Sequence, residues 1–149
     1  MVSVSEFYID QLVSLCHQHN FDGYFLNIES PLYSDMISSL VEFLRVLRTR
    51  LHECNPPKQL LLYDSITNTG DVRYQNGLSS SNKLFFDVCD GLFVNYWWTP
   101  ERLKETASLA CRRYFRLEGP HWYVDAEMSI WVLISLVEIP MEEEAWIPM

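Results

Sequence analysis

The sequence of 149 residues predicts an α/β fold, with strands and helices alternating along the chain and the strands joined in a parallel sheet. Three observations predict this fold. Short apolar runs end on polar residues at Glu29, Asp64 and Asn95, about every 30 to 35 residues, which is the length of one βα unit. Segments with apolar residues at helical spacing separate the runs. Two of the runs share one pattern, an Asp-Gly turn followed by three apolar residues and an asparagine.

The composition excludes several classes of protein. Hydrophobic residues make up 48% and charged residues 21%, which is typical of a globular domain. A net charge of -9 argues against sequence-independent binding of nucleic acid. The four cysteines lie far apart without a C-x-x-C pair, so no zinc site is indicated. No secretory signal or membrane-spanning run is visible, and we expect a cytosolic protein with no membrane partner.

The first predicted unit is a helix followed by a strand. Ser5 is expected to cap the helix, and the strand runs from Tyr24 to Glu29 before Ser30-Pro31 stops it. Because residues two apart in a strand face the same side, Asn27 and Glu29 should point together. They lie at the end of the strand where parallel βα folds place active sites. A pair of solvated polar residues is the alternative that spacing alone leaves open.

The second unit has the clearest helix, which starts near Ser34 or Asp35 and ends at Asn55-Pro56-Pro57. A short strand, Gln59 to Tyr63, follows. Residues 66–81 are rich in Ser, Thr, Asn and Gly and predict a long loop around Tyr74. Long ordered loops in compact domains are often functional, so this loop is a candidate wall of a site.

The third unit begins with a strand that ends near Asn95. Thr99 then caps a helix whose first residue is Pro100. The predicted parallel sheet would bring polar and aromatic residues to one rim, namely Asn27, Glu29, Tyr63, Asn95 and Trp98. A closed (β/α)8 barrel has eight strands and typically about 250 residues. The sequence therefore predicts a fragment of a TIM barrel with about three to four βα units.

The strand-end motifs resemble those of the cytosolic endo-β-N-acetylglucosaminidases, glycoside hydrolase family 85. The resemblance covers about residues 6–113 in order and with similar gaps. It rests on Phe21-Asp22-Gly23 through Asn27-Ile28-Glu29, Leu62-Tyr63-Asp64-Ser65, Phe85-Phe86-Asp87 and the run from Cys89 to Trp98.

The resemblance implies cleavage between the two core N-acetylglucosamines of N-linked glycans, with a free oligosaccharide, glycopeptide or glycoprotein as substrate. It implies no metal and no cofactor. Glu29 matches the general acid and base, and Asn27 matches the amide that holds the substrate's acetamido group. Tyr63 matches an active-site tyrosine. Tyr74, which stands where relatives often have Trp, Asn95 and Trp98 match substrate-binding positions, although packing at the rim is the alternative for the aromatics.

The resemblance stops before residues 116–149. There Met128 to Met149 read MSIWVLISLVEIPMEEEAWIPM, whereas the family continues with another strand and a Gly-rich loop. With permitted codons, the same nucleotides read one base earlier encode DVYMGIDIFGRNTYGGGGMDTN, which is close to that family segment. We therefore expect residues 1–115 to be a partial catalytic domain and residues 116–149 to be an out-of-frame or mis-spliced tail.

Two other functions stand beside hydrolysis. The chain is either an inactive fragment or a non-catalytic carbohydrate-binding α/β module that keeps the aromatic rim. A generic α/β enzyme with another nucleophile is disfavoured, because no G-x-S-x-G motif, no phosphate-binding glycine loop and no Cys with an obvious His partner is present.

Overall fold

The computed structural model describes residues 4–95, 97 and 99–110 of the chain. The predicted tail and Trp98 lie outside these residues. The described elements follow in the order α1 (Val4–Gln18), β1 (Gly23–Leu26), the 3-10 turn η1 (Ser34–Met36), α2 (Ile37–His52), β2 (Gln59–Tyr63), α3 (Lys83–Val88), β3 (Gly91–Phe93) and α4 (Pro100–Ala110).

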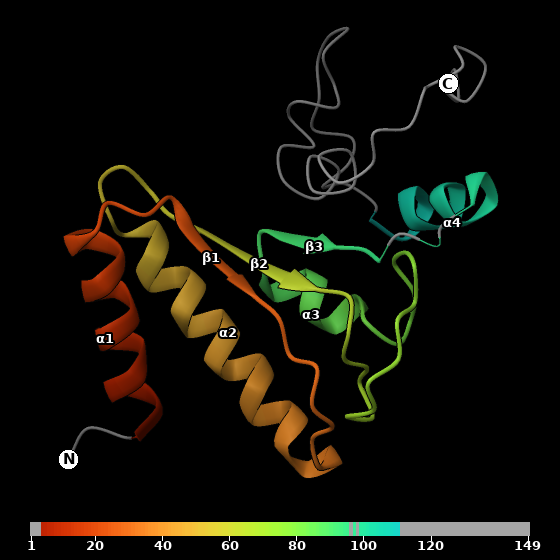
Figure 1. Cartoon of the computed structure of the whole chain (residues 1–149), viewed down its shortest axis with the longest axis horizontal. Helices are drawn as coiled ribbons and strands as arrows, with labels where there is room; N and C mark the ends of the chain where they lie inside the picture. Colours follow the sequence, from red (N-terminus) through yellow and green to blue (C-terminus); the bar gives the residue numbers. More distant parts are fainter. Residues whose placement is uncertain (1–3, 96, 98, 111–149) are drawn as a thin grey trace, which may run out of the picture.

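The three strands form one sheet in the order β1-β2-β3, and both pairs are parallel. Gly23 pairs with Gln59, and Leu62 pairs with Leu92. A helix lies between consecutive strands, as parallel connections require. The predicted α/β class and parallel sheet are therefore confirmed, and all three carboxyl ends meet at one edge of the sheet (Figure 1).

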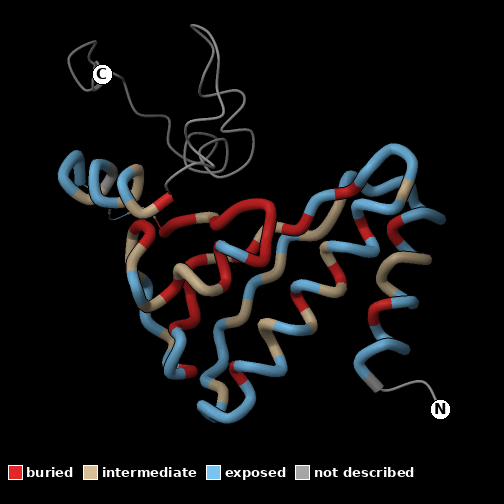
Figure 2. Tube along the Cα trace, turned by 180° about the vertical axis from the view of Figure 1, so that it is seen from behind, coloured by how far each residue is buried: buried red, intermediate tan, exposed pale blue. Residues whose placement is uncertain are grey.

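A layer of helices packs against one face of the sheet (Figure 1). The apolar stripe of α2, with Leu44, Leu47 and Leu51 fully buried, meets Leu60 and Leu62 of β2. Burying one such side chain contributes about 1.5 to 3 kcal/mol. Figure 2 shows these buried positions recurring along α2, while the outward residues of the same helix are exposed. The apolar residues that recur every 3.6 positions in the sequence thus lie on the side of α2 that packs against the sheet.

The other face of the sheet carries aromatic rings. Phe25, Tyr63 and Phe93 come from the three neighbouring strands, and their ring centroids lie 5.0 to 6.0 Å apart. Successive residues of a strand point to opposite faces, so these rings lie opposite the buried leucines. Phe25 remains 48% exposed.

The amino-terminal edge of the sheet is closed by a buried carboxylate. Asp90, in the turn before β3, accepts a hydrogen bond from the backbone N–H of Leu60 at 2.8 Å. Its side chain also pairs with Arg48 and lies 2.9 Å from Nε2 of His52. The contacts tie α2 to the start of β2 and to the turn that precedes β3.

Three predicted element boundaries were wrong, and one helix was missed. α1 begins at Val4, so Ser5 lies inside the helix rather than at its cap. β1 ends at Leu26 rather than at Glu29, because only Gly23 to Leu26 pair with β2. α2 begins at Ile37, after η1, and no side-chain hydrogen bond caps either element. α3 was not predicted, since it has only six residues.

Thr99 does cap α4, because its hydroxyl accepts a hydrogen bond from the N–H of Arg102 at 3.2 Å. Within the described part of the chain, no helix has the length and apolarity that crossing a membrane requires.

Candidate active site

Glu29 lies just beyond the carboxyl end of β1, in the segment that leads to α2. Its Oε1 accepts a hydrogen bond of 3.0 Å from the hydroxyl of Tyr74, which comes from the loop after β2. Both residues are exposed, and Tyr74 is 41% exposed. The only carboxylate predicted to be catalytic is therefore open to solvent and held by one phenol.

A chain of contacts continues from Tyr74 to the other two strands. The ring of Tyr74 lies 5.9 Å from that of Tyr63, centroid to centroid. The hydroxyl of Tyr63 donates to Oδ1 of Asn95 at 3.0 Å. Glu29, Tyr74, Tyr63 and Asn95 thus form one connected group. The sequence predicted that Glu29, Tyr63 and Asn95 would share a rim, but not the contacts that Tyr74 adds.

Asn27 is exposed and lies two residues before Glu29, with Ile28 half-buried between them. The alternation predicted for these residues is kept although they lie beyond the paired strand. The Asn27 amide makes no hydrogen bond with another residue of the described segments. Trp98 falls outside the described residues.

Sequence analysis missed Asn76. Its Oδ1 accepts hydrogen bonds from Nδ2 of Asn95 at 2.9 Å and from the N–H of Trp97 at 3.2 Å. Asn76 has a φ of 54°, in the left-handed region that asparagine tolerates better than most residues. An Asn-Gly dipeptide is a turn signal that could have pointed to this conformation, but it carries no information on the contact with Asn95.

The segment that carries the candidate pair, residues 27–32, is held by the loop after β2, residues 64–82. The hydroxyl of Ser65 donates to the carbonyl oxygen of Ile28 at 2.8 Å. The N–H of Leu32 donates to the carbonyl oxygen of Gly70 at 2.9 Å. Gly70 has a φ of +90°, and a Cβ there would collide with the carbonyl oxygen of Leu32. Only glycine fits this approach of the two segments.

Asp64, the first residue after β2, is 1% exposed. Burial raises the pKa of its carboxyl to about 6, and hydrogen bonds to Asn82 and to backbone N–H groups act in the opposite direction. Asp64 belongs to the quoted family motif, but spacing alone assigned it no role.

Two other features lie away from this group. A groove of about 410 Å³ between α1 and α2 is lined in part by His17, Arg50 and Cys54, at the opposite edge of the sheet. Its walls are mainly apolar and it contains none of the candidate catalytic residues. Among residues 4–95, 97 and 99–110, no three His, Cys, Asp or Glu side chains are grouped in a way that could hold a metal ion.

Curated relatives match most of this chain. A cytosolic endo-β-N-acetylglucosaminidase of Gallus gallus is 42% identical over 104 residues, which is 70% of this chain and 14% of the relative. Cytosolic endo-β-N-acetylglucosaminidase 2 of Arabidopsis thaliana is 35% identical over 138 residues, 85% of this chain and 20% of the relative. The chain therefore spans only about a seventh to a fifth of the length of these proteins.

Among solved structures, the glycoside hydrolase domain of Endo-D from Streptococcus pneumoniae superposes with a TM-score of 0.62. The match has 24% sequence identity and covers 68% of this chain and 17% of that one. The likeness shows that the two share the fold of the matched part. The sequence model of glycosyl hydrolase family 85 matches residues 3–128, and the chain belongs to this family.

Proposed function

We propose that this chain carries the catalytic pair of an endo-β-N-acetylglucosaminidase and forms part of a (β/α)8 barrel. The observation that carries the proposal is the placement of Glu29. It lies beside Tyr74 and two residues after Asn27, at the carboxyl edge of a parallel sheet in a family 85 chain. The names of the relatives favour cleavage beside an N-acetylglucosamine and the cytosol as the location. The family resemblance favours the two core N-acetylglucosamines of N-linked glycans as the point of cleavage.

The proposed reaction is retaining hydrolysis assisted by the substrate, which departs from the usual scheme with two carboxylates. Protonated Glu29 gives its proton to the oxygen between the two N-acetylglucosamines, and the bond from C1 to that oxygen breaks. The carbonyl oxygen of the substrate's own 2-acetamido group attacks C1 and forms a protonated oxazoline ring, which keeps the acetamido N–H and its positive charge. Glu29 then takes a proton from water as the water adds to C1 and opens the ring.

Asn27 is the proposed partner of the acetamido group. Its side-chain oxygen accepts a hydrogen bond from the acetamido N–H, which becomes more acidic as positive charge grows on that group. The interaction is stronger in the transition state than in the bound substrate, as catalysis requires. Tyr63, Tyr74, Asn95 and Trp98 are proposed to contact the sugars, with the aromatic residues providing flat apolar surfaces.

A second candidate is binding of the glycan without turnover. The exposure of Phe25 and Tyr74 favours it, because an open site leaves water around the reacting bond and positions the sugar less well. A weakly bound sugar on the aromatic face needs no proton transfer from Glu29. On this reading the chain is an inactive part of the enzyme.

Mass spectrometry of a high-mannose glycopeptide incubated with the purified chain separates the two candidates. Hydrolysis leaves a peptide that keeps one N-acetylglucosamine, and Glu29→Gln abolishes this product. Binding of the intact glycopeptide is measured beside it by NMR titration of both proteins. Soluble, folded wild-type chain that binds the glycopeptide but leaves it intact would contradict hydrolysis and support the second candidate.

The division of the chain into residues 1–115 and a tail read out of frame is a separate proposal. It is supported by the codon argument alone. Sequencing the transcript across the codons for Arg113 to Met128 tests it. An intact message whose shifted frame lacks the DVYMGID-like segment overturns it.

A further inference from the structure

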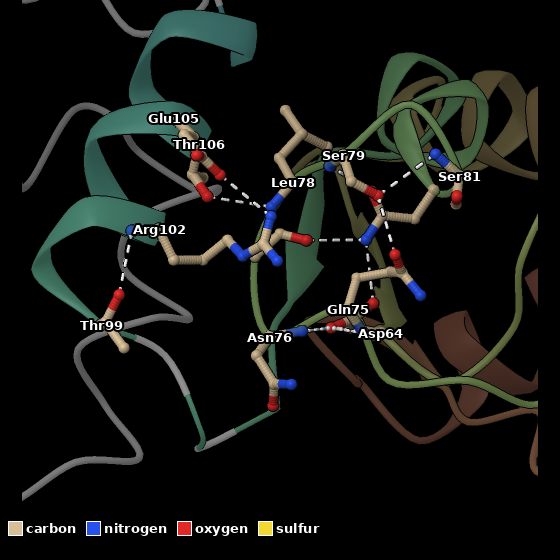
Figure 3. A network of polar contacts seen from close by, with 12 residues as sticks. Asp64, Gln75, Asn76, Leu78, Ser79, Ser81, Thr99, Arg102, Glu105 and Thr106 are labelled. Carbon is tan, nitrogen blue, oxygen red and sulfur yellow. Dashed lines mark hydrogen bonds and ion pairs between the residues drawn. The ribbon is translucent and has the colours of Figure 1, made fainter.

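The carboxylate of Asp64 is buried at the carboxyl end of β2, and its described partners are uncharged hydrogen-bond donors. Oδ2 accepts from the N–H of Gln75 at 3.0 Å and from the N–H of Asn76 at 2.7 Å. Oδ1 accepts from Nδ2 of Asn82 at 2.9 Å. Figure 3 shows Asp64 facing the backbone of Gln75 and Asn76. Burying a carboxylate that has no cationic partner is costly, so a buried Asp64 calls for a role.

The positions of these donors link Asp64 to the candidate site. Gln75 directly follows Tyr74, so the bond from its N–H to Asp64 fixes the peptide unit that joins the two residues. That peptide unit begins at the Cα from which the Tyr74 phenol reaches Glu29. Asp64 itself is next to Tyr63 in the chain. One carboxylate therefore joins the end of β2 to the residue that contacts the proposed acid.

A second branch leaves from Asn76. Its N–H is held by Asp64, while its side-chain oxygen accepts from Nδ2 of Asn95 at 2.9 Å. Oδ1 of Asn95 in turn accepts a hydrogen bond of 3.0 Å from the hydroxyl of Tyr63. Tyr74 is thus connected to Asp64 through one hydrogen bond, at the residue that follows it, and the hydroxyl of Tyr63 through three.

The far side of the same loop is anchored elsewhere. The N–H of Leu78 donates to the hydroxyl of Thr106 in α4 at 2.9 Å, and Gly77 packs so closely that a Cβ there would lie 2.6 Å from Cγ of Arg102. Figure 3 shows α4 on this side of the loop and Asp64 on the other. The α4 contacts begin three residues beyond Tyr74, so Asp64 is the nearer constraint on the tyrosine.

We propose that Asp64 is a positioning residue for the proposed glycosidase reaction, which holds the loop so that Tyr74 keeps Glu29 aligned and Asn95 keeps Tyr63 aligned. The expected effect on catalysis rests on the proposed function. The alignment of Tyr74 with Glu29 does not, because it can be measured without turnover. Asp64 touches neither the substrate nor Glu29. It acts on Glu29 through Tyr74 and on Tyr63 through Asn76 and Asn95.

Asp64→Asn is the test variant, because it keeps the size of the side chain and replaces one acceptor oxygen by a donor. Asp71→Asn is the matched control in the same loop, with an exposed carboxylate. In the full chain, Asp64→Asn should lower kcat on the glycopeptide about 10- to 100-fold per folded molecule, with KM within about threefold. Asp71→Asn should leave both unchanged. A folded Asp64→Asn variant with the kcat of the wild type overturns the proposal.

A second readout does not depend on turnover. The ring carbon signal of Tyr74, assigned with Tyr74→Phe in tyrosine-labelled protein, should shift when Glu29→Gln is introduced. The same Glu29→Gln shift should appear in the Asp71→Asn background and disappear in the Asp64→Asn background. Persistence of the shift without Asp64 overturns the positioning role. A chain in which the shift is lost as expected, but which is inactive throughout, supports the role of Asp64 and counts against the proposed function alone.

Hydrogen exchange in the wild-type chain covers the case in which Asp64→Asn does not fold. The amides of Gln75 and Asn76 should be protected, because Asp64 accepts both in a buried position. Exchange of these two amides at the rate of an unstructured peptide overturns the proposal.

Discussion

An acidic residue lies at each of two edges of the sheet, and the two residues differ in burial and in the number of their hydrogen-bond partners. At the amino-terminal edge, Asp90 is buried and bonded to Arg48, His52 and the N–H of Leu60. At the carboxyl edge, Glu29 is exposed and accepts one hydrogen bond from Tyr74. A buried carboxylate with three close partners has little left to offer a ligand. One that keeps most of its lone pairs free can take up or give a proton.

The comparison teaches that acidic character alone does not mark a site. Asp90 contributes to joining helix and sheet, and its removal should affect folding. Glu29 contributes nothing comparable to packing, and its removal should affect chemistry.

The largest expected effect is on turnover. Glu29→Gln removes the proton donor and should lower kcat by at least about 100-fold, in line with the loss of general acid–base catalysis. The free energy of unfolding should change by less than about 0.5 kcal/mol, because the side chain is exposed. Urea unfolding and the glycopeptide assay, run on the same preparation, measure the two quantities. Strong destabilisation by this variant would break the contrast.

Asp90→Ala should have the opposite profile. It leaves the N–H of Leu60 and the charge of Arg48 without their partner, and should cost about 3 kcal/mol of stability. The value is toward the low end for a broken buried pair because the side chain of Arg48 is 33% exposed. Activity per folded molecule should stay within about twofold. Asp87→Ala, which removes an exposed ion pair with Lys83, is the control and should change stability by less than about 0.5 kcal/mol.

Asp64 is buried like Asp90 but lies at the same edge of the sheet as Glu29, so it separates the effect of burial from that of position. Its folded-state pKa of about 6 lies above the ordinary value of 3.8, so the folded state favours the protonated form. Its contribution to stability is therefore full below about pH 4 and is lost as the pH rises through about 6.

The free energy of unfolding of the wild type, minus that of Asp64→Asn, should fall by roughly 2 to 3 kcal/mol between pH 4 and pH 7. Urea unfolding of both proteins across this range measures the difference. A difference that stays flat, or that rises with pH, would contradict the sign.

The smallest expected effect belongs to the hydroxyl of Tyr74. Tyr74→Phe keeps the ring contact with Tyr63 and removes the bond to Glu29, so kcat should fall about 10-fold, the low end for a hydrogen bond to a charged group because both residues are exposed. Stability should hardly change. Tyr33→Phe, at a tyrosine that is 81% exposed, is the matched control and should have the kcat of the wild type.

The sequence was sufficient to predict the regular elements with strong periodicity. The apolar stripe of α2, the Thr99-Pro100 start of α4 and the three strand positions all follow from local patterns that the structure repeats. The end of β1 was misplaced because a strand ends where its partner turns away, and Asp64 and Ser65 begin that turn in β2. Such an end depends on a residue far along the chain.

The candidate site was predictable as a set of residues but not as a network. Strand-end position and family resemblance indicated Glu29, Tyr63 and Asn95. The bond from Tyr74 to Glu29 joins residues 45 positions apart through an irregular loop, and no periodic pattern describes such a loop. Asn76 and Asp64 were missed for the same reason, since their roles arise from where the loop folds back.

The hydrogen bonds between residues 64–82 and residues 27–32 limit how the loop can be exchanged for that of a relative. Ser65 bonds to Ile28, Gly70 to Leu32 and Tyr74 to Glu29, so the loop contacts the shorter segment at three points. A loop of another length would lose these three points together. The two segments therefore make up a single module, and a chimera that exchanges the loop with a relative must exchange residues 27–32 from the same donor.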